Sequence, residues 1–151
     1  MPGWIRVDQA NAAGGVFGRK IKLVVEDSAY DTKKAVLAAD KLVSSDQVFA
    51  VVGTLGAAPA VATVDAIVDS GSLHLFPLNA HRAMFEPFHK LKFAAYTPYT
   101  ESTRAGVKEL LKKGYKRVAI LYQDDEFGLD ILNGTEAALK EANMALVERT
   151  S

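Results

Sequence analysis

The sequence predicts an α/β fold in which a parallel sheet is flanked by helices on both faces. Short apolar or β-branched segments alternate with longer segments whose apolar residues recur at helical spacing, as in βα units. The 151 residues suffice for roughly one domain, and 49% of them are hydrophobic. Strands that alternate with helices in this way are expected to pair in parallel through right-handed crossovers.

The elements can be assigned in order along the chain. Residues 20–27 are rich in β-branched side chains, which predicts a strand. Asp31 is expected to cap a helix that ends at residues 44–46. The unbroken apolar run of residues 48–52 predicts a strand buried on both faces. The later elements are expected to be strands over residues 73–76, 93–96, 118–122 and from 144–147 onward, and helices over residues 60–68, 101–113 and 127–142.

Three loops follow predicted strands at the edge of the sheet where ligands of open α/β folds bind. They are the Gly53 loop (residues 53–58), the Pro77 loop (residues 77–81) and the Gln123 loop (residues 123–128). The Gly53 loop opens a helix, whose first N–H groups suit a carboxylate or another anion. The backbone amides of the Gly53 loop and of residues 78–80 are predicted to converge on one pocket above the sheet.

Each loop also has an interpretation without a ligand. The Gly53 loop is equally typical of a tight βα turn. Asn79 and His81 could contact a ligand or only satisfy the backbone of their turn, and the second role is favoured for His81. Asp124 or Asp125 is expected mainly to cap the following helix. Phe127 could pack on a ligand or belong to the core.

Several functional classes are disfavoured by composition. The 18 basic and 18 acidic residues balance, so no nucleic-acid partner is expected. No apolar run is long enough to enter a membrane. The chain has no cysteine, its three histidines lack metal-ligand spacing, and no Walker or dinucleotide motif is present, so neither metal nor cofactor is expected. No catalytic motif stands out, and we expect a protein that is not an enzyme; an α/β enzyme is the least favoured class.

Several sequence segments, here called phrases, together resemble the leucine/isoleucine/valine-binding protein family of ABC-transporter solute receptors, the type I periplasmic binding proteins. The resemblance covers essentially the whole chain and depends on the order and spacing of the phrases. They occupy residues 11–21, 25–31, 35–43, 49–53 and 121–128.

The resemblance implies two lobes that close on a solute about a hinge. Residues 1–95 would form the first lobe without its first strand, residues 96–99 a hinge crossing, and residues 100–151 the start of the second lobe. The sequence is therefore expected to be a fragment with exposed sheet edges that tend to associate. The resemblance also implies a periplasmic location, although the N-terminus lacks the pattern of a signal peptide.

The resemblance implies a substrate-binding component of an ABC importer, with permease subunits as partners and a small-molecule solute as ligand. The alternative is a ligand-sensing regulatory or receptor module of the same fold. Residues 56–58 lack the family's usual hydroxyl, and residues 78–80 lack its usual threonine, so the expected solutes include amides, urea and aromatic acids besides branched-chain amino acids. The expected ligand-binding residues are Thr54, Leu55, Gly56, Ala57, Ala58, Leu78, Asn79, Ala80 and Phe127.

Overall fold

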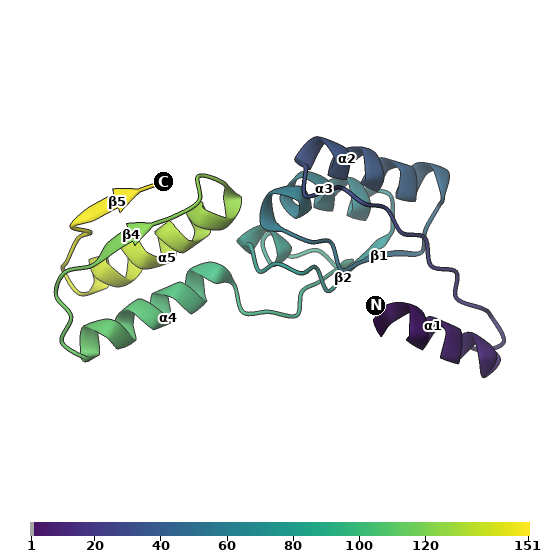
Figure 1. The fold of residues 1–151 in the computed structure, drawn as a ribbon, viewed down its shortest axis with the longest axis horizontal. Coiled ribbons are helices and arrows are strands. Elements are labelled where there is room, and N and C mark those ends of the chain that lie inside the picture. The colour runs from purple at the N-terminus through teal and green to yellow at the C-terminus, as the bar shows by residue number, and fades with distance from the viewer. Residues whose placement is uncertain (1) are drawn as a thin grey trace.

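The computed structural model describes residues 2–151 and confirms an α/β fold with parallel strands (Figure 1). Met1, the first residue of the predicted first lobe and of the N-terminus examined for a signal peptide, lies outside the described residues. In chain order the elements are α1 (Pro2–Ala12), α2 (Thr32–Asp40), the π-helix η1 (Lys41–Ser45), β1 (Ala50–Val52), α3 (Ala57–Asp69), β2 (Leu73–Leu75), the 3₁₀ helix η2 (Arg82–Met84), β3 (Lys92–Phe93), α4 (Tyr99–Lys112), β4 (Ala119–Leu121), α5 (Glu126–Glu141) and β5 (Glu148–Thr150).

The first group of elements is a three-stranded parallel sheet of order β1-β2-β3 with α3 packed on it and α2 packed on α3 (Figure 1). Asp31 caps α2 as predicted, because its side chain accepts a hydrogen bond from the Lys34 N–H. The core of this group lies between α3 and the segment around η2. It contains Ala60, Val64, Val68 and Met84.

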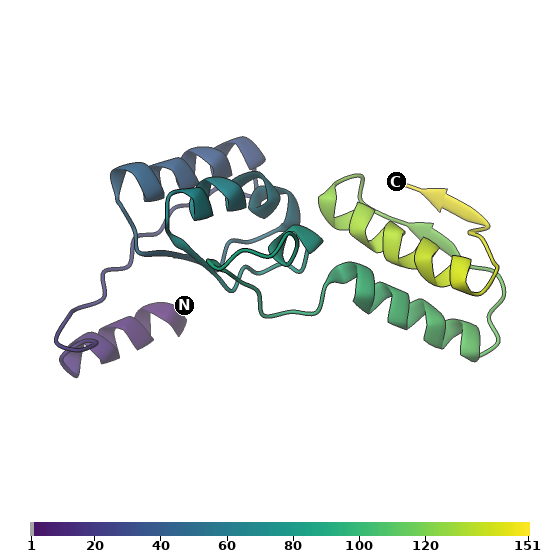
Figure 2. The ribbon, with the colours of Figure 1, turned by 180° about the vertical axis from the view of Figure 1, so that it is seen from behind.

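The prediction that residues 48–52 are buried on both faces is wrong. Phe49 is 82% exposed and Val52 is 62% exposed. An apolar run predicts a strand, but its burial depends on what packs against each face. Among the described residues, α3 packs on this sheet and α2 packs on α3 (Figure 2).

The predicted strand over residues 20–27 is also not formed. This segment is irregular, and Ile21, Leu23 and Val25 are partly exposed. A strand needs a neighbour that shares its ladder of hydrogen bonds, and the described residues supply none here. The Asn11 side chain instead holds the start of the segment, accepting from the Ile21 N–H at 2.7 Å and donating to the Ile21 carbonyl at 2.8 Å.

The second group of elements pairs β4 with β5 in parallel and packs α4 against α5 (Figure 1). Val107 of α4 and Leu139 of α5 lie in its core with Ala138. Leu121 in β4 is 80% exposed, so this sheet too has an uncovered face among the described residues. The strand predicted from residues 144–147 onward is shifted and begins at Glu148.

A single irregular segment joins the two groups between β3 and α4. The strand predicted over residues 93–96 is found at Lys92–Phe93, and the chain then runs without regular structure to Tyr99. The two groups lie side by side along the long axis of the molecule (Figures 1 and 2). Helix α5 of the second group contacts α3 of the first.

Candidate functional site

The Gly53 and Pro77 loops meet at the carboxyl ends of two neighbouring strands. Leu55 and Leu78 form an isolated parallel bridge, and the Leu78 N–H donates to the Thr54 carbonyl at 2.8 Å. The register of β1 and β2 produces this meeting, since Val52 pairs with Leu75 immediately before both loops. The two loops therefore lie together as predicted, and the pocket predicted between them stays a prediction.

The Gly53 loop presents the start of α3. Gly56 precedes the helix with φ 89° and ψ 151°, a backbone conformation essentially restricted to glycine. No side chain caps this end, so the first N–H groups of α3 have no partner from a capping residue. Pro59 lacks an N–H, which leaves Gly56, Ala57 and Ala58 as the backbone donors at this terminus.

Tyr30 lies against Gly56, a contact that the sequence analysis did not find. A Cβ atom added at Gly56 would lie 2.6 Å from Cε2 of the Tyr30 ring. Ala29, Tyr30 and Phe76 have positive φ angles although none is glycine. Backbone strain of this kind gathers at functional sites. No local pattern marks Tyr30, because its partner is 26 positions away in the sequence.

His74 supports the Gly53 loop from within β2. Its Nε2 lies 3.1 Å from the Thr54 hydroxyl oxygen, and its side chain is almost fully buried. Burial, and secondarily the positive charge of Lys92, lowers the pKa of His74 to about 4. His74 is therefore neutral at neutral pH, and it supports the loop through its contact with Thr54.

The side chains of the Pro77 loop turn inward. The Asn79 side chain is 2% exposed, and its Oδ1 accepts from the His81 N–H at 3.1 Å. His81 Nδ1 accepts from the Ala83 N–H at 3.1 Å and so caps η2. Both side chains thus satisfy turn backbone, which is the alternative that the sequence left open. The exposed side chain of residues 78–80 is Leu78.

The Gln123 loop brings the second group to the same region. Asp125 caps α5 by accepting from the Gly128 N–H at 3.0 Å, which decides between the two predicted capping residues. Phe127 is 37% exposed and packs edge-on against Tyr99, with ring centroids 4.9 Å apart. Gly128 allows this tight turn, because a Cβ there would collide with the Gln123 carbonyl.

A buried carboxylate lies where the two groups touch. Asp130, on α5, is 2% exposed, and its Oδ2 accepts from the Arg82 backbone N–H at 3.0 Å. Its Oδ1 lies 3.8 Å from His81 Nε2, which is itself 3.5 Å from Glu126 Oε2. The sequence analysis did not single out Asp130, because a polar residue in an amphipathic helix ordinarily faces water.

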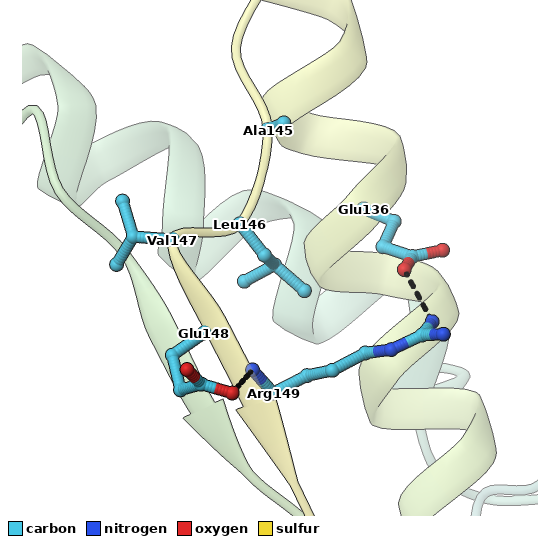
Figure 3. A pocket seen from close by; sticks show the side chains of 6 residues that line it. All are labelled: Glu136, Ala145, Leu146, Val147, Glu148 and Arg149. Carbon is cyan, nitrogen blue, oxygen red and sulfur yellow. Dashed lines mark hydrogen bonds and ion pairs between the residues drawn. The ribbon is translucent and has the colours of Figure 1, made fainter.

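A hollow of about 380 Å³ lies in a different place and is not the candidate site. It is lined by Glu136 of α5 and by residues 145–149, at the start of β5 rather than at its carboxyl end (Figure 3). Arg149 crosses it to Glu136, with Nη1 and Oε1 3.6 Å apart, and all its lining residues come from the second group. Ligands of parallel sheets bind beyond the opposite ends of the strands.

Residues 2–151 contain neither a cluster of metal-ligating side chains nor a helix suited to span a membrane. No group of three metal-ligating side chains lies close enough to hold an ion. No described helix combines the length and hydropathy that a membrane crossing requires.

The order of the elements and the arrangement of their loops match a known family. Residues 5–151 match the family model described as periplasmic binding protein. The chain belongs to the periplasmic binding protein family. This family is one of binding proteins rather than enzymes, in agreement with the prediction from the sequence, and it is the family that the sequence phrases resemble.

Curated relatives of this periplasmic binding protein include amino-acid receptors. The chain is 29% identical over 137 residues to an "Amino acid binding protein" of Pseudomonas aeruginosa, covering 89% of this chain and 36% of the relative. It is 28% identical over 153 residues to a "Leu/Ile/Val-binding protein homolog 7" of Brucella suis, covering 95% and 38%. The chain thus spans less than two fifths of the length of the curated relatives it matches.

Solved structures show the same fold at lower identity. An ABC transporter substrate-binding protein from Desulfitobacterium hafniense in complex with Leu matches with a TM-score of 0.75 and 22% identity, over 96% of this chain and 43% of that one. A solute-binding protein of an ABC transporter from R. palustris in complex with benzoate matches with a TM-score of 0.81 and 19% identity, over 95% and 40%.

Proposed function

We propose that this protein is the substrate-binding component of an ABC importer and works in the periplasm with permease subunits as partners. The observation that carries the proposal is the bridge between Leu55 and Leu78, which joins two strand-end loops at the edge where ligands of parallel sheets bind. The membership of the chain in the periplasmic binding protein family supports it. Solved structures with the same fold include ABC-transporter binding proteins, which agrees with the importer.

The site is proposed to combine a polar anchor with an apolar rim. The backbone N–H groups of Gly56, Ala57 and Ala58 would bind a carboxylate or amide oxygen of the solute. Leu55 and Leu78, which are 58% and 51% exposed, would contact its apolar part. Thr54 would act through its contact with His74. The side chains of Asn79 and Ala80 are buried, so these residues would act through the backbone of their loop.

The second lobe would close the site with Phe127. Residues 1–95 are proposed as the first lobe, residues 96–99 as the crossing, and residues 100–151 as the start of the second lobe. Phe127 is placed at the beginning of α5 near this crossing and keeps part of its ring exposed. Closure of two lobes about a crossing removes the solute from water and strengthens its polar contacts.

The proposed solute is a branched-chain amino acid or a related small amide, urea or aromatic acid. The named ligands of two structures with this fold, Leu and benzoate, share a carboxylate joined to an apolar body. The same two features match the anchor and rim proposed here.

Calorimetric titration of the whole protein with matched pairs tests this function. Leucine is compared with leucinol, and benzoate with benzyl alcohol, because each pair differs in the carboxylate while the apolar body is kept. We expect at least one acid to bind with a Kd in the micromolar range or below, and its alcohol about tenfold or more weakly. Acetamide and urea complete the panel. No binding across the panel, or turnover of any of these compounds, would contradict the proposal.

A further inference from the structure

We propose that Asp130 is a positioning residue that fixes the Pro77 loop to helix α5 and so sets the angle at which the two lobes face the solute. The inference rests on the proposed solute-binding function, which it deepens. Asp130 does not reach the candidate site itself. It acts through the backbone that follows the Pro77 loop and through the helix that carries Phe127.

The first step is the burial of the carboxylate. Asp130 is 2% exposed, and a carboxylate removed from water is retained at low cost only where hydrogen bonds replace its hydration. Its Oδ2 accepts from the Arg82 N–H at 3.0 Å, and its Oδ1 faces His81 Nε2 at 3.8 Å. Both contacts are to residues 48 or more positions away in the sequence and in the other group of elements.

The second step is that neighbouring contacts brace the same junction. The Tyr99 N–H donates to the Ala80 carbonyl at 3.0 Å, which joins the start of α4 to the Pro77 loop. The Thr100 hydroxyl donates to the Asp130 carbonyl at 3.4 Å, which joins α4 to α5. The Pro77 loop, α4 and α5 are thus connected pairwise. Asp130 connects the loop region to α5 from a buried position, and Glu126 adds a more exposed contact with His81.

The third step links this junction to the solute. Phe127 lies three residues before Asp130, so the two side chains are neighbours on one side of α5. Ala80 lies two residues before Arg82 and belongs to the proposed site. A bond between Asp130 and Arg82 therefore limits how far two proposed parts of the site, one from each lobe, can separate before any solute arrives.

Arg82 offers a matched pair of test variants. Its part in the junction is its backbone N–H, while its side chain pairs with Glu86 on the surface. Arg82→Ala keeps the N–H and removes the side chain. Arg82→Pro removes both. Proline is tolerated at the first position of a helix, where Arg82 opens η2, and His81 already has the extended ψ of 142° that a residue before proline requires.

The lobe arrangement can be measured directly because the chain contains no cysteine. Spin labels on Asp69→Cys at the end of α3 and Lys140→Cys near the end of α5, both exposed positions, report the distance between lobes in the whole protein, freed of any other cysteine. Without solute, we expect a narrow distance distribution for the parent and for Arg82→Ala, and a distribution at least twice as broad for Arg82→Pro and Asp130→Ala. Asp130→Ala could fail to fold, in which case the Arg82 pair decides.

Solute affinity provides the second readout. If the loosened junction leaves the binding-competent arrangement about a tenth populated, the apparent Kd of Arg82→Pro rises about tenfold, while that of Arg82→Ala stays within about twofold. Equal distance distributions for Arg82→Pro and Arg82→Ala would overturn the inference. Failure of every solute to bind would contradict the proposed function. It would not affect the test of Asp130, because the distances between lobes are measured without solute.

Discussion

The side-chain oxygen of Thr54 lies 3.1 Å from Nε2 of His74, so a buried histidine inside β2 supports the loop that opens α3. His74 is 1% exposed, and its burial, with the nearby charge of Lys92, lowers its pKa to about 4. Protonation of the His74 ring would place a positive charge in a buried position close to the positive charge of Lys92. Acid is therefore expected to disturb the interior of the sheet and the Gly53 loop together.

Acidification should destabilise the protein through His74. The pKa of the folded protein lies below the ordinary value of 6.5, so the unfolded chain binds more protons between pH 6.5 and about 4. The free energy of unfolding therefore has its full value above pH 6.5. As the pH falls from 6.5 to about 4, it decreases by up to about 3 kcal/mol. Urea unfolding between pH 7.5 and 4.5 measures this fall. The variant His74→Asn should show a smaller one, and an identical fall in both proteins would contradict the assignment.

Gly56 should resist substitution because of its backbone. Its φ of 89° and ψ of 151° are strained for any other residue, so Gly56→Ala is expected to lower the free energy of unfolding by about 1–3 kcal/mol. The Tyr30 ring also crowds this position, but an exposed ring can move aside. The double variant with Tyr30→Ala should therefore keep most of the loss relative to Tyr30→Ala alone. Full recovery in denaturant titrations would show that crowding causes the cost.

The two aspartates before α5 should differ in their effect on stability. Asp125 accepts a hydrogen bond from the Gly128 N–H, and Asp125→Ala is expected to lower the free energy of unfolding by about 1 kcal/mol. Asp124→Ala is the matched control, because its side chain is exposed and is not the cap of α5; we expect a change within about 0.5 kcal/mol. Equal losses in the two variants would contradict the capping role.

Phe127 should contribute to solute affinity. Phe127→Ala removes the partly exposed ring at the start of α5, and we expect the Kd for the bound solute to rise about tenfold or more. Leu129→Ala is the control, since Leu129 is 41% exposed on the same helix but two positions away and thus on the opposite side. A Kd changed equally by both variants would remove Phe127 from the site.

The uncovered sheet faces should make the 151-residue chain associate. Phe49 and Leu121 are 82% and 80% exposed, one on each sheet, and exposed apolar surface of this kind favours contact between copies. Sedimentation velocity should show a weight-average mass that rises with concentration. Phe49→Lys and Leu121→Lys together are expected to reduce that rise, and a chain that stays monomeric at all concentrations would refute the expectation.

The cap of α2 and the parallel pairing of strands were predicted correctly from the sequence, whereas contacts between particular distant side chains were not. Asp31 caps α2 because its side chain needs only the N–H three residues ahead. The alternation of strands and helices likewise predicted parallel pairing and hence the meeting of Leu55 with Leu78.

Failures arose where a structure depends on a partner far away in the sequence. Residues 20–27 have the composition of a strand but no ladder, and the run at residues 48–52 is apolar yet largely exposed at Phe49 and Val52. Tyr30 and Asp130 contribute to the candidate site and its junction through partners 26 and 48 positions away. Composition and periodicity carry no information about such pairs.

Pro59 ends the row of backbone donors at the start of α3 after three residues. In a protein of the proposed function, recognition of the polar headgroup would then depend on peptide groups, which no exchange of side chains other than for proline can delete. The apolar rim at Leu55, Leu78 and Phe127 would remain free to vary. Mutation could accordingly broaden or shift the range of transported compounds while the headgroup anchor persists, which would let one scaffold diversify among related nutrients.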